Sequence, residues 1–271
     1  MIMCRNYSGV CWLMYVAVFK EHTLHKGYIY NVVIANTFNN YFSTVADCIT
    51  AGKKQDITSN RNSPIDYLYK FYSKPYCKMK WQYASTHEIR KIIKALKSKN
   101  SCGYDEITSR IIKVSAPFII SPLTYICNAA LSSGIFPDRL KYAIVKPIYK
   151  KGNRQDISNY RPISLLTTFS KIFERLIFNR LSAHFETTGI LVREQYGFRN
   201  KHSTEQATFS LINSILTALN NSQIVGGIFC DIQKAFDCVN HKILLDKLQF
   251  YGIDGKFKTL IDSYLTNRYQ M

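Results

Sequence analysis

A nine-residue apolar stretch, Ile224–Ile232, constrains the fold of this 271-residue chain more than any other feature. Its sequence, IVGGIFCDI, combines Val and Ile with two glycines and carries one carboxylate, that of Asp231. An apolar run of this length and composition is typical of a buried strand and is short for a helix. We therefore predict a buried strand over 224–232 that ends in a carboxylate.

Helical patterns flank this stretch on both sides. Ser85-Thr86-His87-Glu88 is a capping-box pattern, and apolar residues follow it at helical spacing up to Leu96, with Lys and Arg on the opposite face. Further along, we expect a turn over 101–105, a helix from Ser121-Pro122 to Gly134, and strands over 143–149 and 161–166. A long helix that ends at Gly189 follows, and its inward residues are Ile172, Leu176, Ile177 and Leu181. The last two expected helices run from the Ser203 capping box to Asn220 and over 240–250. Strands interleaved with helices in this order predict an α+β or α/β fold.

Residues 1–84 show weaker patterns. We expect a short helix at 36–41 and a polar linker over 51–64. The apolar run Val10–Phe19 is about half the length that spans a bilayer. It is compatible with the apolar region of a signal peptide, an added N-terminus or a buried strand, and no small-residue cleavage pattern follows it.

The charge balance indicates a polyanionic partner. The chain carries 36 Lys and Arg against 18 Asp and Glu, a formal net charge of +18. Such an imbalance favours nucleic acid ahead of an acidic membrane surface. Eight cysteines are scattered without a C-x-x-C pair, which argues against a disulfide framework or a zinc site and indicates a reducing, intracellular compartment.

The stretch Phe229–Asp237 (FCDIQKAFD) carries the most chemistry. A carboxylate at the end of a buried strand is costly unless a partner neutralises it. Mg²⁺, which prefers oxygen ligands, is one such partner for Asp231. The alternative on local sequence alone is that Asp231 caps the following helix.

Together with Val239-Asn240-His241, this stretch resembles motif A of reverse transcriptases from non-LTR (LINE-type, jockey-like) retrotransposons. Five motifs over about residues 95–271 occur in the order of that family. The upstream ones are Ser101–Asp105 (SCGYD), Lys146–Gly152 (KPIYKKG), Asn159–Leu166 (NYRPISLL), and Gln195–Arg199 (QYGFR) with His202-Ser203-Thr204.

The resemblance implies a right-hand polymerase of α+β class, helix-rich and with an incomplete palm sheet. Its implied divisions are an N-terminal extension and linker over 1–84, fingers over 85–222 and the start of the palm over 223–271. In such enzymes two Mg²⁺ ions activate the primer 3′-hydroxyl and neutralise the departing pyrophosphate. The implied partners are an RNA template, a DNA primer and a dNTP, without a membrane, in the nucleus or cytoplasm.

The resemblance also implies site residues. Asp231 is the catalytic metal ligand, to which Ile232 adds a main-chain oxygen, and Phe236 is the gate against a ribose 2′-hydroxyl. Lys150 and Arg161 hold the dNTP triphosphate, with Lys146 and Lys151 as alternatives in a shifted register. Residues 141–202 hold twelve Lys and Arg against four Asp and Glu, which suits an RNA backbone. Gln195, Phe198 and Arg199 shape the template side.

Other features set this chain apart from that family. No Asp-Asp dipeptide occurs in the 271 residues, although the family's catalytic pair is an aromatic-x-Asp-Asp hairpin. We therefore expect no polymerase activity from this polypeptide alone and an exposed apolar edge where 224–232 lacks that hairpin. The alternative function is a non-catalytic basic RNA-binding remnant of a decayed element. A maturase-like or telomerase-like relative is the third interpretation.

Overall fold

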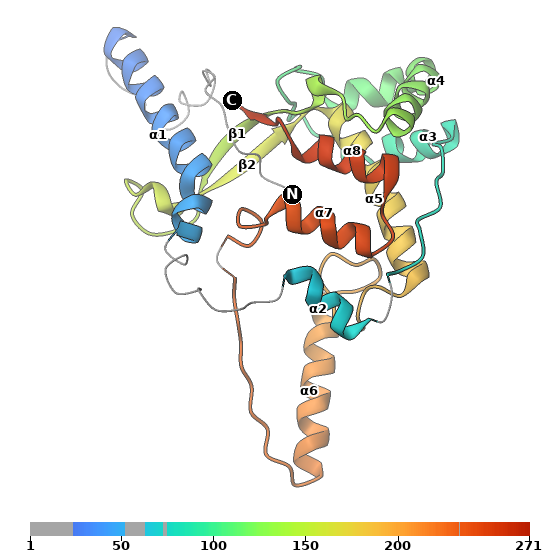
Figure 1. Ribbon diagram of the computed structural model, residues 1–271. Helices are drawn as coiled ribbons and strands as arrows, with labels where there is room; N and C mark the ends of the chain where they lie inside the picture. The colour runs from blue at the N-terminus through green and yellow to red at the C-terminus, as the bar shows by residue number, and fades with distance from the viewer. Residues whose placement is uncertain (1–23, 52–62, 73–74, 233) are drawn as a thin grey trace. The chain divides into compact units, whose positions relative to one another are not determined.

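The computed structural model describes residues 24–51, 63–72, 75–232 and 234–271 (Figure 1). They form two compact units, one of residues up to Arg180 together with Lys234–Met271, and one of residues 181–233. The predicted run Val10–Phe19 and almost all of the predicted linker over 51–64 lie outside the described residues.

The first unit contains most of the regular structure. Its helices are α1 (Leu24–Ala51), α2 (Pro64–Phe71), α3 (Thr86–Ala95), α4 (Ser109–Ser133), α7 (His241–Phe250) and α8 (Gly255–Leu265), and its strands are β1 (Tyr142–Tyr149), β2 (Tyr160–Leu166) and β3 (Tyr269–Gln270). Two short 3₁₀ turns, η1 (Asp138–Leu140) and η2 (Ile157–Asn159), precede β1 and β2. Helix α5 (Thr168–Thr188) begins in this unit and ends in the second, which also contains α6 (Thr204–Asn220). The fold is therefore helix-rich α+β.

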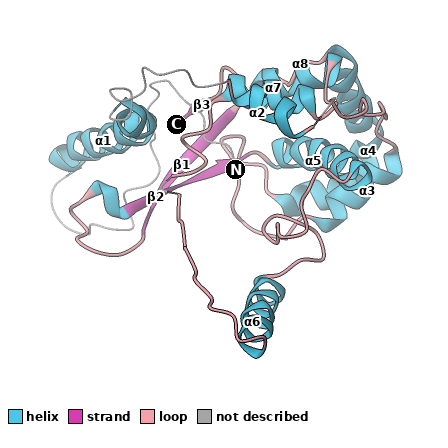
Figure 2. Cartoon of the chain, turned by 60° about the horizontal axis from the view of Figure 1, so that its bottom comes forward, coloured by secondary structure: helices cyan, strands magenta, loops and turns pink. Residues whose placement is uncertain are grey.

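One three-stranded sheet of order β2-β1-β3 lies in the first unit. Strands β1 and β2 form the predicted antiparallel hairpin, with Ile148 opposite Arg161 and Ala143 opposite Leu166. Strand β3 pairs in parallel with β1 and was not predicted. Helix α1 lies beside the hairpin (Figures 1 and 2), and the 28-residue helix is much longer than the predicted segment 36–41.

The core of the first unit is formed by the apolar faces of α3, α4, α5 and α8. Ile89, Ile92 and Ile93 of α3 are buried as predicted, and so are Ile172 and Leu176 of α5. Ile177 and Leu181 are half-buried, because the apolar stripe of α5 turns toward Phe173, which is 4% exposed. The predicted helix ends hold: Ser85 Oγ accepts from Glu88 N, and the cap residue Gly134 has a left-handed φ of 72°.

The predicted start of α4 at Ser121-Pro122 is wrong. The helix begins at Ser109, where Thr108 Oγ1 accepts from Ile111 N, and it continues through Pro117 and Pro122. A proline interrupts the hydrogen-bond ladder, but the continuous buried face of α4 packs against α3 and α8 and outweighs that loss. Among the described helices, α4 is long and apolar enough to cross a membrane by length and composition. A third of its most apolar segment is buried inside the protein.

The predicted buried strand over 224–232 is also wrong. Residues 223–232 have no strand partner among the described residues, and Ile224, Ile228 and Phe229 are 100%, 92% and 88% exposed. A strand is stabilised by hydrogen bonds to a neighbouring strand, and no described strand pairs with this segment. Apolar residues are exposed at this place as expected, but they belong to an unpaired segment and not to the edge of a strand.

Candidate functional site

The β1–β2 hairpin places the two cations predicted to hold a triphosphate on one face. Ile148 lies opposite Arg161, and Lys150 N donates to Asn159 O, so the pairing continues beyond the last residue of β1. Because side chains alternate between the faces of a strand, Lys146, Lys150 and Arg161 share a face. Lys150 and Arg161 are exposed on that face. The hairpin thus presents a cluster of cations to solvent.

The opposite face of the hairpin contacts α1. The Tyr160 ring lies 5.6 Å from the Tyr149 ring and 5.0 Å from that of Phe38 in α1. The side chain of Gln270, in the neighbouring strand β3, donates to Asn39 Oδ1 at 2.6 Å. The cation-bearing face is therefore backed by packed aromatic and amide side chains.

The loop at the hairpin tip is held by its own hydrogen bonds. Tyr149 Oη donates to Gly152 O and Tyr160 Oη donates to Arg154 O. Hydrogen bonds from the Ser158 side chain and then from Ser158 N to the Asp156 carboxylate lower the pKa of Asp156. Gly152 adopts a φ of +96°, a conformation that favours glycine. These contacts order the chain between Lys150 and Arg161.

Asp231 and Ile232 lie on the exposed segment of the second unit. Asp231 is exposed and Ile232 is 72% exposed, so the carboxylate does not end a buried strand. Within the described ranges, no group of three or more His, Cys, Asp or Glu side chains is placed to hold a metal ion. Two-ion catalysis needs several carboxylates around both ions. The described residues therefore do not fit a two-Mg²⁺ site.

Phe236 belongs to a turn that begins at Lys234, where the chain re-enters the first unit. Asp237 N and Cys238 N both donate to Lys234 O, which closes the turn, and Phe236 is 51% exposed. Burial raises the pKa of the Asp237 carboxyl, and the nearby Lys234 charge opposes this shift. Asn240 then caps α7 by accepting from Ile243 N.

The residues predicted to face the template lie in the second unit. Gln195 N and the Arg199 guanidinium both donate to Val192 O, at 3.3 Å and 2.9 Å. Phe198 is 87% exposed and has a positive φ of 58°. The guanidinium of Arg199 thus holds its own loop, and Phe198 is the member of the group that presents an aromatic surface to solvent.

The structure brings some predicted residues together and leaves others in different units. Lys150, Arg161 and Phe236 belong to the first unit, whereas Gln195, Phe198, Arg199, Asp231 and Ile232 belong to the second. Sequence reasoning assigned no role to α1, although Phe38 and Tyr41 contact this region and Phe42 packs against both of them. Their spacing of i, i+3 and i+4 is a signal that could have identified this face.

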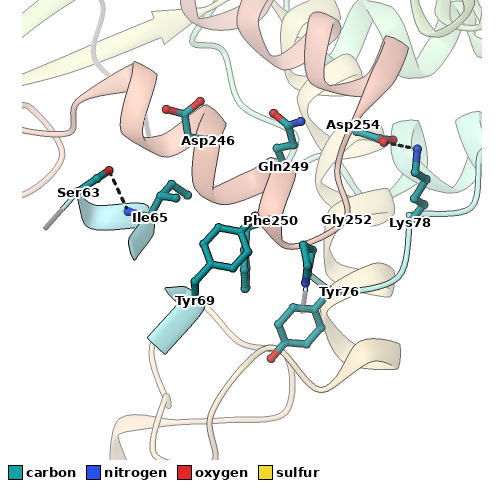
Figure 3. Close-up of a pocket in the computed structure, with 11 residues that line it drawn as sticks. Ser63, Ile65, Tyr69, Tyr76, Lys78, Asp246, Gln249, Phe250, Gly252 and Asp254 are labelled. Atoms are coloured by element: carbon teal, nitrogen blue, oxygen red, sulfur yellow. Dashed lines mark hydrogen bonds and ion pairs between the residues drawn. The ribbon is translucent and has the colours of Figure 1, made fainter. Parts of the chain in front are cut away.

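A hollow of about 520 Å³ lies between α2 and α7, away from the predicted residues (Figure 3). Tyr69, Tyr76 and Phe250 line it, and an ion pair of 2.7 Å between Lys78 and Asp254 borders it. Backbone bonds from Tyr76 N to Phe250 O and from Met79 N to Gly252 O join the wall to the end of α7. The hollow therefore lies where residues 63–72 and 75–79 contact α7 and the residues that follow it.

Comparisons with known proteins agree with the family that the motifs indicate. Residues 148–271 match the family model described as reverse transcriptase (RNA-dependent DNA polymerase). The chain is 36% identical over 188 residues to a probable RNA-directed DNA polymerase from transposon BS of Drosophila melanogaster, an alignment that covers 67% of this chain and 20% of that protein. It is 31% identical over 214 residues to the RNA-directed DNA polymerase from mobile element jockey of the same species, covering 74% and 23%. The chain thus spans about a fifth of the length of these relatives.

Proposed function

Since residues 148–271 belong to the reverse transcriptase family, with non-LTR retrotransposon relatives, we propose that this chain is part of an RNA-directed DNA polymerase of a mobile element. Its substrates would be an RNA template, a DNA primer and a dNTP. The shared, exposed face of Lys150 and Arg161 on the ordered hairpin is the observation that carries this proposal.

The chemistry of the hairpin face suits a triphosphate. A guanidinium presents a planar fork that matches phosphate oxygens, and an ammonium adds a mobile point charge. Lys146 lies on the same face and extends the positive surface along β1. The opposite face contacts α1 through Tyr160, whereas Lys150 and Arg161 are exposed on this face.

The proposed organisation follows the family. Residues 85–222 would form the fingers, 223–271 the start of the palm, and 1–84 an extension that precedes them. Phe236 would stand against the ribose 2′-hydroxyl, and Gln195, Phe198 and Arg199 would line the template. The exposure of the Phe198 ring supports a stacking role, because a base stacks on an aromatic face whatever its sequence.

The family uses a divalent metal, and we propose that Asp231, with the Ile232 carbonyl, contributes to its site. Asp231 is the one carboxylate in 224–236, and the described residues do not complete a two-ion site around it. We therefore derive no metal-dependent step and expect no primer extension by this chain alone. Extension on poly(rA)/oligo(dT) with Mg²⁺, above background and lost in Asp231→Ala, would show that further carboxylates complete the site.

Binding experiments test the hairpin face directly. Because a triphosphate and an RNA backbone both present phosphate oxygens, we expect Lys150→Gln and Arg161→Gln each to weaken binding of dTTP and of a single-stranded RNA. Each should also reduce the slope of log K against log salt by about 0.7 for every RNA phosphate that the variant no longer neutralises. Lys242→Gln, an exposed cation on α7, is the matched control for removal of one charge. Equal effects of all three substitutions would mean that net charge alone drives binding.

A non-catalytic RNA-binding remnant is the second candidate, and the exposure of Asp231 favours it. It predicts the same salt-sensitive binding through the hairpin cations. It also predicts that Asp231→Ala leaves every measurable property unchanged. Both proposals expect RNA binding and no primer extension by this chain alone, and extension that is lost in Asp231→Ala would exclude the remnant.

A further inference from the structure

Helix α1 contacts three separate parts of the first unit. Phe38 packs edge-on against Tyr160 of the hairpin, and Asn39 accepts a hydrogen bond from Gln270 of β3. The third contact joins Tyr41 to Lys234 in the turn that contains Phe236. Helix α1 precedes residues 148–271, which carry the family match. It nevertheless contacts the cation-bearing hairpin and this turn.

The contact between Tyr41 and Lys234 has two components. The Lys234 Nζ atom lies 4.6 Å from the centroid of the Tyr41 ring, and it donates a hydrogen bond of 3.2 Å to Tyr41 Oη. A cation within about 6 Å of an aromatic face is attracted by the ring. The Tyr41 ring is itself half-buried and packs against Phe42, which is 9% exposed. Tyr41 is thus held by the packing of α1.

Lys234 is the residue on which the turn depends. Its carbonyl accepts from both Asp237 N and Cys238 N, and its backbone has a left-handed φ of 49°. A non-glycine residue in that region is strained and persists where its surroundings hold it. The Lys234 charge also faces the half-buried Asp237 carboxyl. The Lys234 side chain therefore links the Tyr41 ring to the turn.

We propose that Tyr41 is a positioning residue, which holds Lys234 and through it fixes the turn that presents Phe236 to the nucleotide. The nucleotide part of this assignment rests on the proposed function, whereas the fixing of the turn does not. It gives α1 a specific role: the helix couples the hairpin with Lys150 and Arg161 to the turn with Phe236.

Hydrogen–deuterium exchange of peptides covering 234–240 in the full chain tests the first part. Loss of the contact between the Tyr41 ring and Lys234 should change the equilibrium constant for local opening of the turn by about threefold to thirtyfold. Tyr41→Leu should therefore speed exchange in these peptides by that factor. Tyr41→Phe keeps the ring but loses the hydrogen bond to Oη, so its exchange rate should lie between those of wild type and Tyr41→Leu. Asn39→Ala is the matched control. Asn39 lies on the same helix as Tyr41, and its substitution removes the hydrogen bond from Gln270 of β3 but leaves the contact with Lys234 in place.

A second pair of variants tests the contact from the other side. Lys234→Met should reproduce the faster exchange, and Lys234→Arg should restore most of the protection because its guanidinium also stacks on a ring. Unchanged exchange in both Tyr41→Leu and Lys234→Met would overturn the proposal. Equally fast exchange in Tyr41→Phe and Tyr41→Leu would overturn the role of the ring.

The nucleotide part is measured with a fluorescent dTTP analogue in Mg²⁺ and poly(rA)/oligo(dT). We expect Tyr41→Leu to weaken its binding several-fold and Tyr41→Phe, which keeps the ring but not the hydrogen bond, to have a smaller effect. A loosened turn with unchanged dTTP affinity would overturn the positioning role. If wild type binds no dTTP while Tyr41→Leu still loosens the turn, the proposed function fails and the fixing of the turn stands.

Discussion

Arg180 and Glu88 form a two-pronged ion pair that joins α5 to the start of α3. Arg180 Nη1 lies 2.7 Å from Glu88 Oε1, and Nη2 lies 2.7 Å from Oε2. The same guanidinium donates to Gln82 O and Tyr83 O, and both charged side chains are largely buried. One guanidinium thus fixes the approach to α3 and its first turn.

Glu88→Gln should therefore destabilise the chain. A hydrogen bond to a charged group contributes about 1.5–3 kcal/mol, and we expect a loss of that order in the free energy of unfolding. The hydrogen bonds from Arg180 also lower the pKa of Glu88. A lowered pKa stabilises the fold above the ordinary carboxyl range and loses that effect on acidification. In urea titrations the difference between wild type and variant should shrink as the pH falls, and the exposed Glu186→Gln should show no such difference.

Glu174 should show the opposite pH dependence. Burial raises the pKa of this carboxyl, against the effects of the Tyr264 hydroxyl, which donates to it at 2.9 Å, and of Arg268 at 3.9 Å. The folded chain then holds the proton more tightly than the unfolded chain. This contribution to stability is complete below the unfolded pKa and is lost as the pH rises through the folded one. The stability of wild type relative to Glu174→Gln should thus fall as the pH rises above the ordinary carboxyl range, and a flat difference would contradict this.

Gly103 leaves no room for a side chain, because a Cβ there would lie 2.6 Å from Thr167 N and 2.8 Å from Thr167 Cα. Both neighbours are backbone atoms between β2 and α5 and cannot move aside easily. Gly103→Ala should cost about 1–3 kcal/mol in thermal or urea unfolding, as overpacking does. Gly197→Ala is the control, since no atom lies within 4 Å of its added Cβ. Equal stability of the two variants would refute the close approach.

The exposed segment 224–232 should promote aggregation. Ile228 and Phe229 are 92% and 88% exposed, and apolar surface of this kind favours association. Replacing both with Ser should reduce light scattering on concentration and change the unfolding free energy by less than about 0.5 kcal/mol. Replacing both with Leu keeps the apolar surface and should leave scattering high. A large loss of stability in the Ser variant would show that these side chains are packed.

Local sequence determined those features that depend on neighbouring residues alone. The caps at Ser85 and Ser203 and the left-handed end at Gly134 follow from short-range hydrogen bonds and φ preferences. The hairpin follows from two β-prone runs around a turn-rich loop. The family was inferred from the sequence motifs, and the comparisons confirm this family. None of these inferences needed a contact between distant segments.

Tertiary structure decided what depends on such contacts. The sequence pattern paired Glu88 with Ser85, whereas folding brings Arg180, 92 residues away, to its carboxylate. Burial against α3 and α8 allows α4 to continue through two prolines, and 224–232, with which no described strand pairs, is exposed. The contact of Tyr41 with Lys234, 193 residues apart, was not visible in any local pattern. Periodicity reports which face of an element is apolar, and only the fold determines what that face meets.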